Sequence, residues 1–192
     1  GFAELGTVTP RPQPGNERPR LFRDPARSSL FNRMGFNGAG AEVVSRRLAG
    51  VKAELPSDFR VGVNLGKNKD TSLEDASKDY AIAAAAFRDL ADYLVINVSS
   101  PNTPGLRSLQ TVKALKPIVG AVNQVIGGWS RRPPLLLKLA PELSGEDLAS
   151  IIREAEGWNI DGWIFTNTLG GSIDVPNSPS SASKTLAGGW SG

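Results

Sequence analysis

The sequence has no cysteine and no histidine among its 192 residues. Without cysteine there is no disulfide framework, no cysteine-containing zinc site and no cysteine nucleophile. Without histidine, every catalytic triad that uses imidazole as its base is excluded, so any proton transfer needs another base. Long apolar runs are missing too: no stretch approaches the roughly 18 to 20 residues of a transmembrane helix, and no signal peptide is visible.

The remaining composition is that of an ordinary globular chain, with 40% hydrophobic and 21% charged residues. It predicts one domain with a hydrophobic core. The net charge of +3 is mild, and we expect no nucleic-acid partner. A second hypothesis is a non-catalytic module that binds nucleic acid or an anionic surface through the arginines between Arg11 and Arg33. The chain opens on Gly1, and we expect it to be an internal piece of a longer protein.

Strand and helix patterns alternate along the chain. Apolar runs of strand length occur at residues 2–9, 60–66, 93–97, 134–141 and 162–168. Between them, apolar residues at spacings of three and four predict helices over residues 39–53, about 70–90 and 109–126, and from 144 onward. Such alternation gives right-handed βαβ units and a parallel sheet.

Four stretches depart from this pattern. The prolines of residues 10–15 predict an irregular connection, and residues 18–23 an extended segment. Residues 32–38 form a glycine-containing loop. Residues 170–187 are rich in Ser, Pro and Gly and predict a mobile loop, followed by a turn at residues 188–192.

Polar side chains stand at the carboxyl end of each predicted strand. They are Thr7, Asn64, Asn97 with Ser100, Lys138, and Thr166 with Asn167. In parallel sheets the carboxyl ends of the strands form one edge, where ligands bind, so we expect these groups to form one site. Amides and hydroxyls suit the edge of a planar heterocycle better than a divalent metal, and no metal site is predicted.

Lys138 is the single charge in its strand, and two hypotheses explain it. It could neutralise negative charge on a cofactor ring, or it could form a Schiff base as in barrel aldolases. No glycine-rich dinucleotide fingerprint follows a strand.

The sequence resembles the class 2 dihydroorotate dehydrogenases, the membrane-associated, quinone-using branch of an FMN-dependent family. The matching motifs are Glu4–Asn16, Asn32–Asn37, Val63–Lys69, Asn97–Thr103, Gly105–Gln110, Lys138–Pro141, Thr166–Thr168 and Gly188–Gly192. The resemblance implies an incomplete (β/α)8 TIM barrel of about strands 2 to 6. Residues 1–192 would be part of a single FMN-binding domain, with amino-terminal membrane-docking helices and the last strands outside this chain.

The resemblance also implies an activity, oxidation of dihydroorotate to orotate in pyrimidine biosynthesis, with FMN as hydride acceptor and a membrane quinone as final acceptor. The implied catalytic base is Ser100. The implied FMN contacts are Thr7, Asn64, Asn97, Lys138, Thr166 and Gly192. The implied substrate contacts are Asn32, Arg33, Met34, Gly35, Phe36, Asn97, Asn102, Asn167 and Thr168.

Location and loop behaviour follow from the same resemblance. The family works peripherally on a bacterial cytoplasmic or mitochondrial inner membrane, and its docking segment would lie outside this chain. Residues 99–109 are expected to close over the substrate, and Arg23 to lie near the quinone channel. Trp190 departs from the leucine usual in the family's Gly-Gly-Leu-Ser-Gly motif.

Overall fold

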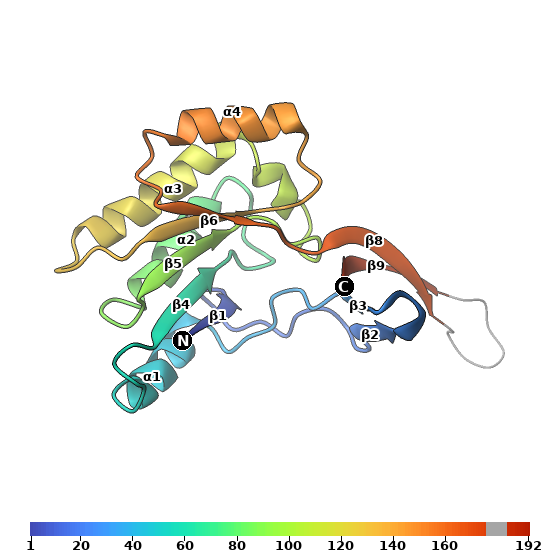
Figure 1. Ribbon diagram of the computed structural model, residues 1–192, viewed down its shortest axis with the longest axis horizontal. Coiled ribbons are helices and arrows are strands. Elements are labelled where there is room, and N and C mark those ends of the chain that lie inside the picture. The colour runs from blue at the N-terminus through green and yellow to red at the C-terminus, as the bar shows by residue number, and fades with distance from the viewer. Residues whose placement is uncertain (176–183) are drawn as a thin grey trace.

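The computed structural model describes residues 1–175 and 184–192, which form a five-stranded parallel sheet and a four-stranded antiparallel sheet (Figure 1). The parallel sheet contains β1 (Phe2–Val8), β4 (Arg60–Leu65), β5 (Tyr93–Asn97), β6 (Leu135–Leu139) and β7 (Gly162–Phe165), in that order. The connecting helices are α1 (Ala41–Lys52), α2 (Ala76–Ala85), α3 (Val112–Gly127) and α4 (Gly145–Ala155). The predicted alternation of strands and helices is therefore confirmed.

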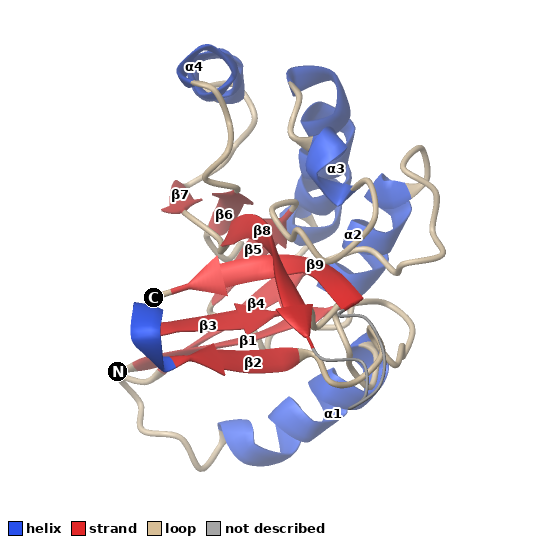
Figure 2. Ribbon diagram, turned by 90° about the vertical axis from the view of Figure 1, so that its right-hand side faces the viewer, coloured by secondary structure: helices blue, strands red, loops and turns tan. Residues whose placement is uncertain are grey.

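The helices α1 to α4 lie around the outside of the strands (Figure 2), and the core lies between these helices and the parallel sheet. The central strands are continuous apolar runs because both of their faces are covered. Fully buried side chains from the strands and from α2 and α3 meet there, including Val63, Leu94, Ile96, Leu137, Tyr80, Leu115 and Val122. Within the described residues, no helix is both long enough and apolar enough to cross a membrane.

The helices α2 and α3 begin several residues later than predicted, and each has a polar reason. The carboxylate of Asp79 accepts hydrogen bonds from the backbone N–H of Asn68 (2.8 Å) and the hydroxyl of Thr71 (2.7 Å), which holds residues 68–71 as a turn ahead of α2. The third helix begins at Val112, because the side chain of Thr111 caps its first turn by accepting from the N–H of Ala114. Residues 106–109 form a separate 3-10 turn, η2 (Leu106–Leu109).

The antiparallel sheet corrects two predictions. It contains β2 (Leu21–Asp24), β3 (Ser29–Asn32), β9 (Lys184–Ser191) and β8 (Leu169–Val175), and a 3-10 turn, η1 (Pro25–Arg27), joins β2 to β3. The mobile loop predicted for residues 170–187 is wrong for residues 170–175 and 184–187, and the turn predicted for 188–192 is largely strand; residues 176–183 lie outside the described residues. The hairpin pairs Leu169 with Trp190 at one end and Val175 with Lys184 at the other.

Glycine misled the prediction because its role here is to make room for aromatic rings. The rings of Phe31 and Trp190 lie 4.9 Å apart on this sheet. A Cβ atom at Gly188 would come within 2.5 Å of Phe31, and one at Gly171 within 2.9 Å of Trp190. The absence of a side chain at Gly171 and Gly188 is thus a packing requirement of the two strands.

At the amino ends of the parallel strands, one hydrogen-bonding device occurs twice. Before β5, the carboxylate of Asp92 accepts from the N–H of Val61 (2.8 Å), and the N–H of Asp92 donates back to the Val61 carbonyl (2.8 Å). Before β7, Asp161 and Leu135 exchange the same pair of bonds, at 2.7 and 2.8 Å. Each aspartate thereby satisfies the first free N–H of the neighbouring strand and fixes the register of the two strands.

A cation completes each pair. Lys52 lies 3.1 Å from Asp92, and Arg132 lies 2.7 Å from Asp161. Burial raises the pKa of Asp92, but the Val61 N–H and the Lys52 ammonium outweigh it and hold this pKa below its ordinary value. A group with a depressed folded pKa stabilises the protein above its unfolded pKa and loses that contribution as the pH falls through the folded value.

We predict that Asp92→Ala lowers the free energy of unfolding of the intact protein by about 1–2 kcal/mol at neutral pH, because the buried N–H of Val61 loses its partner. Urea denaturation measures this change. The difference from wild type should shrink as the pH falls below the unfolded pKa of about 3.9 and through the lower folded pKa of Asp92. Asp70→Ala is the control, because its ion pair with Arg11 is exposed and should contribute less than about 0.5 kcal/mol. Equal losses in the two variants would contradict the prediction.

Candidate active site

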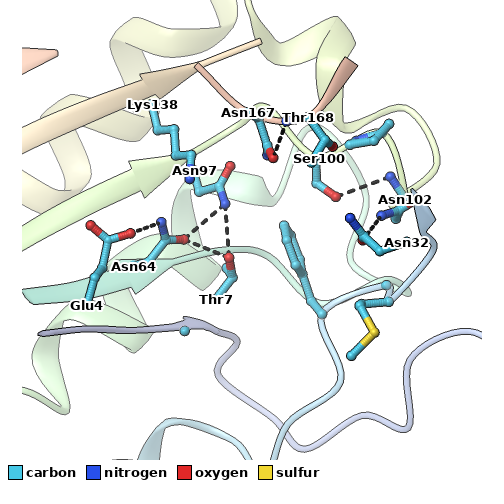
Figure 3. A pocket seen from close by; sticks show the side chains of 15 residues that line it. Glu4, Thr7, Asn32, Asn64, Asn97, Ser100, Asn102, Lys138, Asn167 and Thr168 are labelled. Atoms are coloured by element: carbon cyan, nitrogen blue, oxygen red, sulfur yellow. Dashed lines mark hydrogen bonds between the residues drawn. The ribbon is translucent and has the colours of Figure 1, made fainter. Parts of the chain in front are cut away.

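A cavity of about 180 Å³ lies at the carboxyl ends of the parallel strands. Its lining comes from the ends of β1, β4, β5 and β6, from the segment after β7, and from the loop after β3 (Figure 3). The lining residues are Glu4, Gly6, Thr7, Asn32, Met34, Gly35, Phe36, Asn64, Asn97, Ser100, Pro101, Asn102, Lys138, Asn167 and Thr168. The structure therefore brings most of the predicted site residues together.

Three predicted residues lie outside this lining. The side chain of Thr166 is exposed, and its hydroxyl donates to the carbonyl of Asn167 (3.2 Å). The guanidinium of Arg33 donates to the carbonyl of Glu17 (3.2 Å). Gly192, at the end of β9, packs against the backbone of Ser28, which a Cβ atom would approach within 2.4 Å.

One wall of the cavity is a set of polar side chains that satisfy one another. Asn64 donates from Nδ2 to Glu4 (2.9 Å) and accepts at Oδ1 from the Thr7 hydroxyl (2.7 Å). Asn97 donates from Nδ2 to both Thr7 (2.9 Å) and Asn64 (3.0 Å). Buried amides without partners would cost roughly 1–3 kcal/mol each, so these bonds are what allows them to stand at the strand ends.

Ser99 extends this set across the sheet, and the sequence analysis assigned it no role. Its hydroxyl donates to Asn97 Oδ1 (2.7 Å) and accepts from Asn167 Nδ2 (2.9 Å). Ser99 is fully buried, and its two hydrogen bonds join the end of β5 to the segment after β7. Its position two residues after Asn97 in the motif was the only sequence signal. We call Glu4, Asn64, Thr7, Asn97, Ser99 and Asn167 the closed network.

A second group of polar atoms keeps free hydrogen-bonding capacity, and Figure 3 shows part of it on the side of the cavity away from Glu4. Asn102 donates from Nδ2 to Asn32 Oδ1 (3.0 Å), but its buried Oδ1 has no partner among the described residues. Ser100 accepts the N–H of Asn102 (3.1 Å), which leaves its own O–H to donate. Lys138 is half-buried and has no ion-pair partner in the described part of the chain. We call Asn32, Ser100, Asn102 and Lys138 the open group.

Glu4 is the one carboxylate in the lining of this cavity, and the alternation of side chains along a strand did not predict it. Residues that alternate along a strand point to opposite faces, so Glu4 and Thr7 should lie on different sides. A bulge between Leu5 and Val8 shifts the pairing of β1 with β4 and brings both side chains to the cavity. Among the described residues, no group of three or more carboxylate side chains could hold a metal ion.

Arg107 fastens the loops around the cavity. Its Nε donates to the carbonyl of Ser99 (3.0 Å), its Nη2 to that of Thr168 (3.1 Å), and its Nη1 pairs with Glu142 at 2.6 Å. Glu142 also accepts the N–H of Gly170. Burial raises the pKa of Glu142, but the Gly170 N–H and the Arg107 guanidinium outweigh it and hold this pKa below its ordinary value. One planar guanidinium thus connects the segments after β5, β6 and β7.

These features define a class: a β/α-barrel protein with a polar cavity at the carboxyl ends of its parallel strands. The family model for dihydroorotate dehydrogenase matches residues 1–192. The chain belongs to the dihydroorotate dehydrogenase family.

Two curated relatives carry the name dihydroorotate dehydrogenase (quinone). The protein from Thermobifida fusca is 47% identical over 195 residues, covering 100% of this chain and 52% of the relative. The protein from Acidithiobacillus ferrooxidans is 50% identical over 199 residues, covering 100% of this chain and 53% of the relative. The chain thus spans about half the length of the curated relatives it matches.

Solved structures agree with the fold. The structure of DHODH from Eimeria tenella in complex with ferulenol matches with a TM-score of 0.86 and 39% identity, over 100% of this chain and 55% of that one. The ligand-free structure from the same organism also gives a TM-score of 0.86. The predicted fold, part of a TIM barrel, is confirmed.

We predict that Arg107→Lys lowers the free energy of unfolding of the intact protein by about 1–2 kcal/mol, because lysine keeps the charge beside Glu142 but loses two carbonyl contacts. Urea denaturation measures this change. Arg46→Lys on α1, whose pair with Glu42 is exposed, is the control and should change stability by less than about 0.5 kcal/mol. An unchanged stability in Arg107→Lys would show that charge alone is what position 107 requires.

Proposed function

We propose that the intact protein containing this chain oxidises dihydroorotate to orotate, with FMN as hydride acceptor and quinone as final acceptor, in pyrimidine biosynthesis. One observation carries the proposal: a single cavity joins strand-end amides, a buried serine and a lysine that has no ion-pair partner among residues 1–175 and 184–192. The family membership and the names of the two relatives support the reaction class.

The closed network and Lys138 fit one flat flavin ring. Thr7, Asn64 and Asn97 are held in fixed orientations at three adjoining strand ends, and Gly6 keeps the backbone close, since a Cβ there would lie 2.6 Å from the Asn64 carbonyl. Asn97 has all its amide atoms engaged within the protein, so a ring contact would exchange one of those bonds. Lys138 would place its ammonium beside the ring and favour negative charge there.

The open group fits the substrate. Dihydroorotate presents ring N–H and C=O groups that need both acceptors and donors. The buried Oδ1 of Asn102 is an acceptor, and Asn32 keeps its Nδ2 donors beside it. Asn167 and Thr168 complete this side of the cavity, and Phe36 from the loop after β3 lines it as well. A ring held against these side chains would lie beside Ser100.

Ser100 is the base in this proposal and takes the proton from C5 of dihydroorotate. When bound, FMN accepts the hydride from C6 of the substrate and passes the electrons to quinone. Ser100 is 5% exposed, and the N–H of Asn102 orients its oxygen. Serine is a weak base at its ordinary pKa, so its hydroxyl proton must pass on to solvent as the substrate proton arrives. The sequence supplies no histidine for this task.

The names of the relatives support quinone as the oxidant. Because quinones dissolve in lipid, we propose that the intact protein works peripherally at the inner membrane, on the cytoplasmic face in bacteria or in mitochondria. Membrane contact would come from a segment outside these 192 residues.

We predict that Ser100→Ala in the intact protein retains FMN but slows flavin reduction by dihydroorotate about 100-fold or more, because the base is removed while the closed network remains. Anaerobic stopped-flow bleaching of the flavin measures the rate, and reoxidation by quinone against fumarate identifies the acceptor. Ser108→Ala is the control, because that exposed hydroxyl donates to the Gly105 carbonyl and lies outside the cavity lining. Reduction at the wild-type rate in Ser100→Ala would remove Ser100 from the reaction.

We predict that Lys138→Gln slows the same reduction by at least about tenfold, because the cation no longer stabilises negative charge on the ring. Wild-type protein should form no adduct at Lys138 when treated with borohydride and a carbonyl substrate. A trapped lysine adduct, in protein that binds no flavin, would instead support the Schiff-base enzyme.

A further inference from the structure

The last residues of the matching motif Glu4–Asn16 have no role in the site described so far. Residues 10–15 were predicted only to form an irregular connection, yet the segment Pro12–Asn16 lies against the loop Asn32–Gly38 that carries part of the cavity lining. Gln13 and Gly38 exchange two backbone hydrogen bonds of 3.0 Å, and the N–H of Asn16 donates to the carbonyl of Met34 (3.0 Å). Backbone hydrogen bonds therefore attach the segment Pro12–Asn16 to the proposed substrate loop.

The loop Asn32–Gly38 has a backbone conformation that is costly in free energy. Phe36 has a φ angle of 53° and Gly35 one of 71°. Glycine accepts this left-handed region freely, but for another residue it costs roughly 1–2 kcal/mol. Phe36 lines the cavity, and its ring fits beside Gly66, where a Cβ would approach it within 3.0 Å. Such a conformation persists only where the surrounding contacts enforce it.

The side chain of Gln13 supplies those contacts. Its Nε2 donates to the carbonyls of Gly35 and Phe36, both at 3.0 Å. Its Oε1 accepts from Asn68 Nδ2 (2.9 Å) and from the N–H of Lys69 (3.0 Å). Only a primary amide offers two donors on one atom and an acceptor on the other, so neither glutamate nor arginine could replace all four bonds.

The support behind Gln13 is buried and fixed. Asn68 is 2% exposed, and its backbone N–H donates to Asp79 on α2 (2.8 Å). Asn68 also exchanges two hydrogen bonds with the backbone of Arg11, each 3.0 Å long. A connected series of hydrogen bonds therefore runs from α2 through Asn68 and Gln13 to the backbone of Phe36.

We propose that Gln13 is a positioning residue that holds Gly35 and Phe36 in the left-handed conformation in which this loop lines the substrate side of the cavity. This inference rests on the proposed function. Without the two Nε2 bonds the loop would populate other conformations, and the apparent substrate affinity would fall by the fraction of molecules that remain competent. Gln13 does not touch the closed network, so flavin binding would be unaffected.

The test compares Gln13→Glu with wild type in the intact, flavin-loaded protein. Glutamate keeps the size of the side chain and the acceptor for Asn68 and Lys69, but it loses both donors to the loop. We expect KM for dihydroorotate and Kd for orotate to rise about tenfold, with flavin content and Tm close to wild type and a smaller change in kcat. Gln13→Met, which is apolar and of similar length, should raise KM at least as much.

Arg11→Gln is the matched control, because it alters the same segment through an exposed ion pair with Asp70. Wild-type KM in Gln13→Glu and Gln13→Met, or an equal rise in Arg11→Gln, would overturn the proposal. Amide hydrogen exchange over residues 33–38 gives a readout independent of the reaction, with exchange in Gln13→Glu about tenfold faster than in wild type. Should wild type fail to oxidise dihydroorotate, the proposed function fails, and unchanged exchange would separately refute the positioning role.

Discussion

The structure of the cavity depends on the closed network, which links the carboxyl ends of β1, β4 and β5 to the segment after β7. Each of its buried amides would be costly without a partner, and both Asn64 and Asn97 have partners on a neighbouring or nearby strand. Sheet register and network therefore require one another. A slip of one residue in β5 would turn Asn97 to the opposite face and leave Asn64 and Thr7 without their shared partner.

The closed network and the open group have different roles: the first fixes the shape of the cavity, and the second offers polar atoms that can bind a ligand. Side chains that satisfy one another are held in place before any ligand arrives, so little ordering cost remains for binding. The atoms with unused capacity, on Asn102, Ser100 and Lys138, are few and lie around the same space. In a buried site, unused capacity is where ligand bonds gain most, because the alternative is an unsatisfied polar group.

The strand ends could be predicted because an apolar run that stops at an amide can be recognised from the sequence alone, as at Asn64 and Asn97. Glu4 could not, because a bulge in β1 reverses the alternation that would have revealed it. The strands β8 and β9 were missed because glycine was taken as a sign of a loop. Gly171 and Gly188 instead leave space for the rings of Trp190 and Phe31, which come together only in the folded chain. Whether Thr166, Arg33 and Gly192 contact a ligand remains a prediction, since they lie outside the cavity lining.

The two loop supports share a physical logic that sequence patterns do not carry. Arg107 and Gln13 both bind backbone carbonyls, so the residues they hold need no particular side chain, and nothing at positions 99, 168 or 35 signals the contact. Such loops have no sheet partner to satisfy their carbonyls near the cavity. A side chain that supplies several donors at once can satisfy two carbonyls while paying side-chain entropy only once. The loops around this cavity are therefore held in place by Gln13 and Arg107, which do not line the cavity themselves.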